Sequence, residues 1–276
     1  MKEKLVSPDD VRALHPAFRG KQGDTLIRWA MKFSGIHIAN DFYDASKHLT
    51  GQAFCTDLLN KMGVQRIVKN AEILDEFKDK PFITVSNHPY GHIDGIAVIE
   101  TVASRVNNYK MMVNLVLGLI DTMSENFITV DPYKKEKLRV ITMSGLKECI
   151  SHVKNGHPLG FFPAGAVSNI YIRKGKPVIL DREWQASVIK LIQKFHVPII
   201  PIHISGYNSI WFYLSRAFGW KARNLRLCHE LDNKRDKKVT LTIGEAIMPS
   251  TVKKQEDINA LNKLLYTTTY NLAKQR

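Results

Sequence analysis

Short β-prone runs alternate with longer segments of helical periodicity along most of the chain, and this order restricts the fold more than any other feature. Strands are predicted at Pro81–Ser86, Tyr109–Val113, Phe127–Val130, Leu159–Phe162, Val197–Ser205, Leu225–Leu231 and Val239–Ile243. Helices are predicted at Ile96–Val106, Asp131–Lys154, Trp184–His196, Asn208–Phe218 and Gln255–Ala273. Strands that alternate with helices in this way favour an α/β fold.

The first 65 residues are predicted to form a helical segment that packs as one unit with an α/β domain at residues 66–276. Apolar side chains recur at helical spacing between Thr25 and Met62. Four aromatic side chains of this segment either cap the core or lie in a membrane interface. They are Trp29, Phe33, Phe42 and Phe54.

An excess of basic residues bears on the partners of the chain rather than on its fold. The 276 residues include 40 Lys and Arg against 26 Asp and Glu, a formal net charge of +14. This charge fits anionic partners such as nucleic acid, lipid headgroups, phosphorylated metabolites or an acidic carrier protein. The 44% share of hydrophobic residues is typical of a globular protein and excludes a largely disordered chain.

The sequence shows neither a signal peptide nor a membrane span. The N-terminus lacks the apolar stretch of a signal peptide, and no run reaches the ~18 apolar residues that cross a bilayer. Cys55, Cys149 and Cys228 lie far apart and form no CxxC pair. We therefore expect neither a disulfide framework nor a cysteine zinc site, and a reducing compartment fits best.

The loop after the first predicted strand carries the most reactive set of side chains. His88 and Asp94 lie close in sequence, with Gly91 between them to permit a tight turn. An imidazole beside a carboxylate is the basic unit of general-base catalysis, because the carboxylate fixes the tautomer and stabilises the imidazolium. Two other interpretations stay open. In one, both side chains only hydrogen-bond the backbone; in the other, His88, His92 and Asp94 hold a metal such as zinc.

A second segment of interest is the turn that follows the predicted strand Leu159–Phe162. Its small residues, Pro163–Ser168, present backbone N–H groups that can hold a phosphate or an oxyanion. Arg173 follows closely, with Lys174 and Lys176, and adds positive charge. The alternative is an ordinary turn followed by a solvated basic run.

The third segment is the apolar run Val197–Ser205. Pro198 and Pro201 interrupt it, which indicates strand ends or the edge of a sheet. Pro201 is a candidate for the wall of a pocket. His203, on the same run, is interpreted as a hydrogen-bonded core histidine rather than a catalyst.

Together the three segments resemble the glycerolipid (lysophospholipid) acyltransferases, which are 1-acylglycerol-3-phosphate acyltransferase-like. The match is to the bacterial hemolysin-like or ornithine-lipid-type branch. Its histidine and aspartate motif is matched by Asn87–Gly95, its Phe-Pro-Glu-Gly phosphate motif by Phe162–Ser168, and its late Val-Pro motif by Val197–Ile202. Shorter matches are Asp181–Trp184, Gly206–Ser209 and Ile243–Ile247. The resemblance implies the glycerol-3-phosphate acyltransferase-like fold, a central, mostly parallel mixed sheet flanked by helices.

The resemblance also implies an activity. A fatty acyl group would pass from the thioester of acyl-CoA or acyl-acyl carrier protein to the hydroxyl of a lysophospholipid or lyso-aminolipid, in membrane lipid biosynthesis. His88 would be the general base, and Asp94 would orient it. Substrate-binding residues would be Phe162, Pro163, Gly165, Ser168, Arg173 and Pro201. Neither a metal nor another cofactor is expected.

The chain departs from the family pattern at two places. Five residues separate His88 from Asp94, where most members have four, and the hemolysin-like branch shares this longer form. Ala164 replaces the glutamate of the phosphate motif, and Ser168 stands near the place of its arginine. The second departure favours an acceptor without phosphate, such as a lyso-aminolipid.

The implied partners are the acyl donor, the lyso-lipid and an anionic membrane surface. We expect a cytoplasmic protein that associates peripherally with the inner face of the cell membrane. Nucleic acid is not expected as a partner, because the lysines are scattered and no recognisable module is present. The alternative functions are a metal-dependent hydrolase that uses His88, His92 and Asp94, and a non-catalytic lipid-binding relative.

Overall fold

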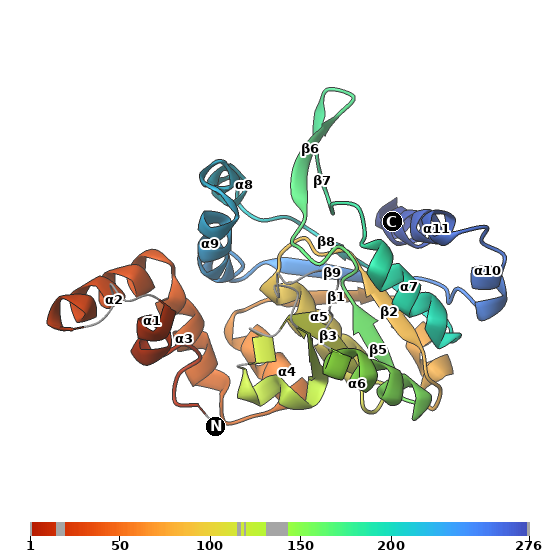
Figure 1. Cartoon of the computed structure of the whole chain (residues 1–276), viewed down its shortest axis with the longest axis horizontal. Coiled ribbons are helices and arrows are strands. Elements are labelled where there is room, and N and C mark those ends of the chain that lie inside the picture. The colour runs from red at the N-terminus through yellow and green to blue at the C-terminus, as the bar shows by residue number, and fades with distance from the viewer. Residues whose placement is uncertain (1, 15–19, 115–116, 119, 131–142, 275–276) are drawn as a thin grey trace.

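The computed structural model describes residues 2–14, 20–114, 117–118, 120–130 and 143–274 (Figure 1). Its centre is a seven-stranded sheet in the order β1-β9-β8-β2-β5-β3-β4. The strands are β1 (Gln65–Lys69), β2 (Ile83–Ser86), β3 (Lys110–Asn114), β4 (Phe127–Val130), β5 (Leu159–Phe161), β8 (Ile199–Ser205) and β9 (Lys238–Ile243). Neighbouring strands are parallel except for β8 and β9. The expected α/β fold with a mostly parallel mixed sheet is confirmed.

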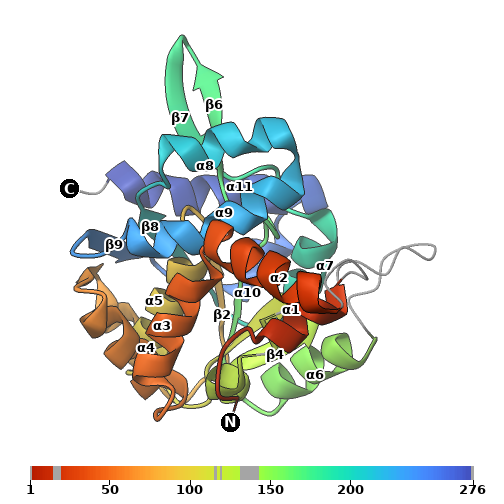
Figure 2. The same ribbon diagram turned by 90° about the vertical axis from the view of Figure 1, so that its left-hand side faces the viewer.

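Helices cover both faces of this sheet (Figures 1 and 2). They are α1 (Pro8–Leu14), α2 (Lys21–Phe33), α3 (Ile36–Ser46), α4 (Gly51–Lys61), α5 (His92–Ala103), α6 (Met143–Lys154), α7 (Ala186–Phe195), α8 (Ile210–Leu214), α9 (Trp220–Asp232), α10 (Pro249–Lys253) and α11 (Ile258–Asn271). The helix predicted from Asp131 is described only from Met143 onward, and its predicted start lies outside the described residues. No helix in the described part of the chain has the length and apolarity needed to cross a membrane.

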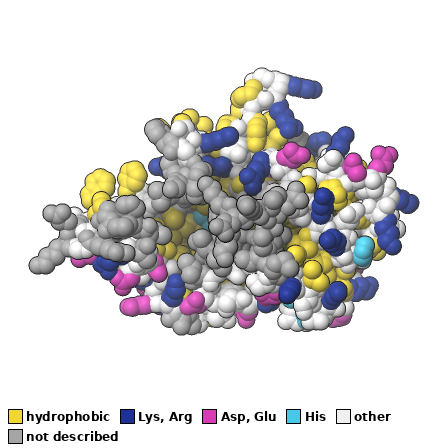
Figure 3. All heavy atoms as spheres, viewed as in Figure 1, with side chains coloured by type: hydrophobic (Ala, Val, Ile, Leu, Met, Phe, Trp, Pro, Cys, Tyr) yellow, Lys and Arg dark blue, Asp and Glu magenta, His cyan; other side chains and the backbone are white. Residues whose placement is uncertain are grey.

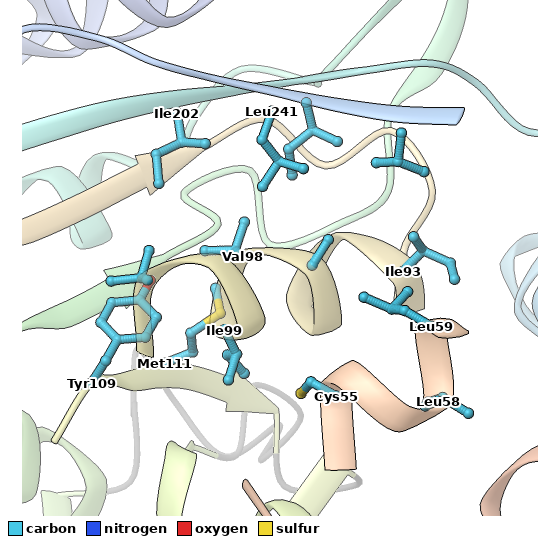
Figure 4. Close-up of a cluster of buried hydrophobic side chains, with 14 of the residues drawn as sticks. Cys55, Leu58, Leu59, Ile93, Val98, Ile99, Tyr109, Met111, Ile202 and Leu241 are labelled. Atoms are coloured by element: carbon cyan, nitrogen blue, oxygen red, sulfur yellow. The ribbon is translucent and has the colours of Figure 1, made fainter. Parts of the chain in front are cut away.

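The sheet separates two hydrophobic cores. In the larger one α5 lies between α4 and the sheet. Val98 of α5 points toward the sheet and Ile202 of β8, and Ile93 at the start of α5 lies beside Leu59 of α4 (Figure 4). The other core joins the opposite face of the sheet to α6, α7 and α11, around Val85 and Trp184. Burial on both faces explains why the strands read as continuous apolar runs in the sequence.

The predicted strand Leu225–Leu231 is wrong, because these residues lie inside α9. The alternation of leucine with polar residues also satisfies helical spacing, since Leu227 and Leu231 are four residues apart. On the same helix Glu230 lies 3.4 Å from Lys234, an i,i+4 ion pair whose two side chains are buried. Tertiary packing therefore decides this segment, where the local pattern allowed either structure.

The two prolines were interpreted as strand ends or a sheet edge. Pro198 directly precedes β8 and so marks a strand end, but the sheet edge is wrong, because β8 lies between β9 and β2. The sheet tolerates Pro201 there because the ladder with β9 ends one residue away, at the pair Ile202 and Ile243. The Pro201 carbonyl accepts a hydrogen bond from Gly244 N–H at 2.8 Å. Proline has no backbone N–H to donate. At Pro201 the missing donor would face the chain beyond the end of β9, so the strand pairing does not need it.

Two parts of the β structure are absent from the sequence prediction. One is β1, and the other is a two-stranded hairpin of β6 (Asn169–Arg173) and β7 (Lys176–Leu180), which projects from the sheet (Figure 1). Its turn residues Lys174 and Gly175 have φ of 50° and 73°. Two consecutive positive φ values are those of the I′ turn that closes tight hairpins. The basic run noted in the sequence is the tip of this hairpin.

The N-terminal helices divide the four aromatic side chains into two pairs. Phe42 and Phe54 are buried, so a place in a membrane interface is wrong for them. Trp29 and Phe33 on α2 are 69% and 71% exposed. Helix α4 also supplies core residues to the main sheet, so the N-terminal segment and the α/β domain share one core.

Candidate active site

The proposed base lies at the carboxyl end of the central strand β2. The side chain of Asn87 extends the pairing beyond the strand: its Nδ2 donates to Ile204 O at 2.8 Å and its Oδ1 accepts from Ile204 N–H at 2.7 Å. These two bonds fix the backbone on which His88 follows. The site therefore forms at the edge where open α/β sheets bind their ligands.

His88 and Asp94 meet across the tight turn that the sequence predicted. His88 Nδ1 lies 2.8 Å from Asp94 Oδ2, an ion-pair distance that lacks hydrogen-bond alignment in this structure. The His88 side chain is 17% exposed, whereas Asp94 is completely buried. Because Nδ1 faces the carboxylate, Nε2 is the nitrogen left to receive a proton from a bound molecule. Contacts of this kind often tighten only when substrate is bound.

Asp94 is fixed in place by the backbone of the same turn. Its Oδ2 accepts hydrogen bonds from Tyr90 N–H and Gly91 N–H, both at 2.8 Å. Asp94 also lies in the first turn of α5, where the helix dipole favours a negative charge. Gly91 has φ 100°, and a Cβ there would lie 3.0 Å from Leu227 and Val167, so the turn requires glycine.

Phe162 forms one wall of the site. Its ring stacks on the imidazole of His88, with centroids 4.2 Å apart and planes 21° from parallel. The ring is partly buried and follows β5, the neighbour of β2 in the sheet. The stacked ring restricts rotation of the imidazole. Nε2, at the edge of the imidazole, is then the atom that a substrate can reach.

A second carboxylate, Asp181, supports the backbone behind His88. Its Oδ1 accepts from His88 N–H at 3.1 Å and from the Ser168 hydroxyl at 2.6 Å. Its Oδ2 accepts from Trp184 Nε1–H at 2.9 Å. Burial raises the pKa of the Asp181 carboxyl, although these bonds oppose the shift. Sequence reasoning gave Asp181 no role, and the only signal was its place in the short match Asp181–Trp184.

The small-residue turn after Phe162 uses one of its expected free backbone N–H groups in an internal hydrogen bond. Gly165 N–H, a candidate for anion binding, donates to Phe162 O at 2.9 Å and is thus occupied. The N–H groups of Ala166 and Val167 have no acceptor among the described residues. Gly165 is exposed with φ 59°, and a Cβ there would lie 1.9 Å from Gln185 Nε2. The turn fits only glycine at that position.

Three of the predicted substrate-binding residues are buried. Ser168 points at Asp181, and its N–H donates to His88 O at 2.8 Å, so it braces the loop from behind. Pro163 is buried, and its carbonyl accepts from Gln185 N–H at 3.0 Å. Pro201 is buried within β8. Of the three, Ser168 supports the His88 loop directly, whereas Pro163 and Pro201 bond to Gln185 and Gly244.

Arg173 lies apart from the proposed base. It lines a cavity of about 390 Å³ between the β6–β7 hairpin, the segment after it and α11. The described lining also includes Arg182, Lys263, Trp184 and Tyr266, but neither His88 nor Phe162. The cavity and the proposed base share the segment at Asp181.

His92 points away from the other two residues of the suggested metal set. Its Nε2 lies 2.8 Å from Leu227 O, and its Nδ1 accepts from Ile93 N–H at 2.9 Å. Burial lowers the pKa of His92 to about 4, so the ring is neutral and both nitrogens are in use. The described residues contain no group of three His, Cys, Asp or Glu side chains that could hold a metal ion. The geometry leaves His88 and Asp94 as a pair.

This pair can remove a proton from a hydroxyl group at Nε2 and return it to a leaving group. Among the described residues the imidazole contacts Asp94 and Phe162 rather than a serine or cysteine side chain, so the nucleophile would be part of the bound substrate. The arrangement suits direct transfer between two substrates without a covalent enzyme intermediate.

Comparison with known proteins places the chain among acyl-transferring enzymes. The family model described as "Acyltransferase" matches residues 21–274. The chain is similar to a lyso-glycine lipid O-acyltransferase of Phocaeicola vulgatus, 29% identical over 215 residues that cover 75% of this chain and 73% of the relative. It is also similar to a protein of the same name from Bacteroides thetaiotaomicron, 28% identical over 216 residues, 75% of each chain.

Among solved structures, the chain is similar to PlsC, the 1-acyl-sn-glycerophosphate (LPA) acyltransferase of Thermotoga maritima. The identity is 18% and the TM-score 0.48, over 91% of this chain and 92% of the other.

Proposed function

Because the chain belongs to the acyltransferase family, we propose that His88 and Asp94 transfer a fatty acyl group from a thioester to the hydroxyl of a lyso-lipid. The observation that carries the proposal is the 2.8 Å approach of His88 Nδ1 to the buried Asp94 carboxylate. It places a carboxylate beside the imidazole, and a hydrogen bond between them on substrate binding would fix the tautomer that an attacking hydroxyl requires.

The reaction proceeds through proton transfer at Nε2. His88 takes the proton of the acceptor hydroxyl as the oxygen attacks the thioester carbonyl carbon, and Asp94 offsets the charge that develops on the ring. The tetrahedral intermediate then collapses, the C–S bond breaks, and the leaving thiolate takes the proton back from His88. Throughout the reaction, the stacked ring of Phe162 keeps the imidazole in the same orientation.

The turn after β5 is the proposed site for the oxygen of the tetrahedral intermediate. Gly165 N–H is occupied, so the N–H groups of Ala166 and Val167 are the candidates. Preorganised backbone donors of this kind are worth roughly 2.7–4 kcal/mol each in acyl transfer. Ser168 contributes through its bond to Asp181 rather than by touching substrate.

We propose a lyso-lipid without a headgroup phosphate as the acceptor. Ala164 replaces the glutamate of the family's phosphate motif, and it is buried beneath the turn, where Arg182 Nε donates to its carbonyl at 2.7 Å. Two relatives are named lyso-glycine lipid O-acyltransferases, which supports an amino-acid-containing lyso-lipid. Lysophospholipid is the alternative acceptor.

The acyl donor would be acyl-CoA or acyl-acyl carrier protein, both of which carry an anionic phosphopantetheine arm. Arg173, Arg182 and Lys263 around the cavity supply positive charge for that arm. No cofactor is proposed. The enzyme would work in the cytoplasm at the inner face of the cell membrane.

The test is an acyl-transfer assay with the purified protein. Palmitoyl-CoA or palmitoyl-acyl carrier protein is incubated with lyso-glycine lipid, lyso-ornithine lipid or lysophosphatidic acid. Thiol release and the mass of the lipid product are measured for the wild type and His88→Ala. A diacylated aminolipid that is absent with the variant supports the proposal, and the better donor identifies the thioester.

Two results would contradict the proposal. If no donor and acceptor pair gives product while the protein binds lipid, the chain is a lipid-binding relative rather than a transferase. If His88→Ala retains wild-type turnover, the base lies elsewhere. A higher rate with lysophosphatidic acid than with either aminolipid would reassign the acceptor.

A further inference from the structure

Most of the large hydrophobic side chains that reach solvent belong to three segments far apart in the sequence. In the described part of the chain twelve such side chains are exposed, and nine of them lie on α2, on β6 or at residues 207–214. They are Leu26, Trp29, Phe33, Ile170, Ile172, Tyr207, Ile210, Trp211 and Leu214. Such a concentration of exposed hydrophobic side chains on a few elements is unusual for a surface that faces only water, and it indicates an interaction surface.

Each segment presents these side chains on one side only. On α2, Trp29 and Phe33 stack with ring centroids 6.3 Å apart, while Ile27 faces the interior. On α8, Phe212 is buried under the Arg223 guanidinium, 4.6 Å from its ring centre, while Trp211 is 63% exposed. Both helices are therefore anchored by one face and offer the other.

The hairpin repeats this arrangement with a period of two. Ile170 and Ile172 share one face of β6, and their partners across the ladder are Ile179 and Pro177. Directly opposed residues of an antiparallel pair point to the same side, so the hairpin has one apolar face. Ile172, near its tip, is 70% exposed.

The three segments lie on one side of the molecule. Figure 1 places α2 at its left edge, the hairpin at its top and α8 between them, and Figure 2 places α8 and the hairpin at the top with α2 below them. Figure 3 shows hydrophobic side chains along this side over α2 and on the hairpin. We call the exposed apolar side chains of α2, β6 and residues 207–214 the docking face.

Basic side chains accompany the docking face. Exposed cations stand on α2, on the hairpin and just beyond the third segment: Arg28, Lys32, Arg173, Lys174, Lys176 and Arg216. The hairpin and residues 207–219 contain no acidic residue, and Asp24 is the acidic residue of α2. Positive charge mixed with Trp and Ile matches an anionic bilayer, whose surface attracts each nearby Lys or Arg and whose interface accepts Trp.

Hydrogen bonds connect two parts of the docking face, the hairpin and residues 207–214, to the loop of the proposed base. Asn208, within the third segment, donates from Nδ2 to Tyr90 O at 3.0 Å, inside the turn between His88 and Asp94. Ser168, directly before β6, donates from its N–H to His88 O at 2.8 Å. Tyr90 OH donates to Ser205 O at 2.9 Å, just before the third segment. Two of the three segments, the hairpin and residues 207–214, thus begin next to the loop of the proposed base.

We propose that the docking face binds this protein to an anionic lipid bilayer. The hairpin and α8 insert into the bilayer next to the loop of the proposed base, and α2 inserts as a third anchor. The proposal rests on the proposed function, since a lyso-lipid acceptor would then enter from the bilayer next to His88. A planar, fluid surface suits three separate anchors, because lipids conform to each. A second copy of the chain would need one rigid surface complementary to all three.

The test measures vesicle binding without turnover. Wild-type protein is co-sedimented with vesicles of phosphatidylcholine alone or with 30% phosphatidylglycerol, beside Trp211→Ser and Ile172→Ser. Met248→Ser is the matched control, because Met248 is 47% exposed but lies next to α10, outside the docking face. His88→Ala separates binding from catalysis and should bind like the wild type.

We expect wild-type protein and Met248→Ser to bind the anionic vesicles equally, and each docking-face variant to bind about tenfold more weakly. Tryptophan emission of the wild type should shift to the blue on binding, and less so in Trp211→Ser. Wild-type failure to bind anionic vesicles would overturn the proposal even if acyl transfer is observed. An equal loss of vesicle binding in Met248→Ser would also overturn it. So would a dimer of the wild type in sedimentation analysis that Trp211→Ser or Ile172→Ser converts to a monomer. Vesicle binding without any acyl transfer would keep the proposal and reject the proposed function.

Discussion

Asp181 holds the backbone of His88 rather than its ring. One oxygen of this buried carboxylate accepts from His88 N–H at 3.1 Å and from the Ser168 hydroxyl at 2.6 Å. The other oxygen accepts from Trp184 Nε1–H at 2.9 Å. The His88 loop, the turn after β5 and the segment after the hairpin therefore meet at one side chain, and Asp181 is a positioning residue for the proposed base.

Asp181→Asn should lower kcat while KM changes little. An amide offers one acceptor oxygen where the carboxylate offers two, so its NH₂ group must face a donor and the His88 loop shifts. A displacement of about 1 Å in a reacting group costs on the order of 10²-fold in rate. Steady-state kinetics with a saturating donor would give kcat and KM separately.

The double variant His88→Ala with Asp181→Asn distinguishes positioning from general destabilisation. If Asp181 acts through His88, the double variant should be no slower than His88→Ala alone, because residues that act as a unit are not additive. Further loss in the double variant, or equal kcat in Asp181→Asn and wild type, would remove Asp181 from this role.

His88→Ala should reduce acyl transfer by about 10³–10⁴-fold, because the acceptor hydroxyl loses its base. The fold should survive, since the imidazole stacks on Phe162 at the surface of the site and is 17% exposed. The rate is measured by thiol release, and thermal unfolding serves as the control. A variant with near-normal turnover would contradict the mechanism.

Asp94→Asn should slow the reaction by a large factor while the turn stays formed. The amide oxygen can still accept from Tyr90 N–H and Gly91 N–H, which now bond Oδ2 at 2.8 Å. The negative charge beside His88 Nδ1 is lost, however, and a comparable change in a catalytic triad costs about 10⁴-fold. Single-turnover rates would show the chemical step directly. An unchanged rate would leave Asp94 as a structural residue only.

The centre of the site was predictable because it is local. His88, Gly91 and Asp94 lie on one turn after an apolar strand, so the chain itself brings the imidazole to the carboxylate. The parallel sheet was predictable for a similar reason, since strands buried on both faces appear as apolar runs. The order of those runs with helices then fixed the α/β class.

The support of the site was not predictable from local pattern. Asp181 reaches His88 from across 93 positions, and it does so because a hairpin carries the chain away and back. The hairpin was missed because its I′ turn is Lys174-Gly175 rather than the commoner Asn-Gly or Asp-Gly. The strand predicted at Leu225–Leu231 failed because its spacing fits two structures, and packing against α3, α5 and α8 selects the helix.

His203 should make the protein less stable in mild acid. Its ring is buried in β8 against Tyr270, with centroids 5.8 Å apart, and its Nδ1 has no hydrogen-bond partner among the described residues, so the bonded core histidine expected from the sequence is wrong in that detail. Burial lowers the pKa of His203 from 6.5 to about 4. Below pH 6.5 His203 therefore binds a proton in the unfolded chain, whereas in the folded chain it binds one only below about pH 4.

The stability that neutral His203 provides is accordingly complete above pH 6.5 and is lost as the pH falls toward 4. At pH 5 the loss is about 2 kcal/mol, from 1.36 kcal/mol per pH unit below 6.5. Urea unfolding at pH 7 and pH 5 should show this loss in the wild type and a smaller one in His203→Gln, which has no proton to bind. His92, whose pKa burial also lowers to about 4, contributes equally in both proteins and cancels. If the free energy of unfolding falls by the same amount in both proteins, the acid sensitivity does not come from His203.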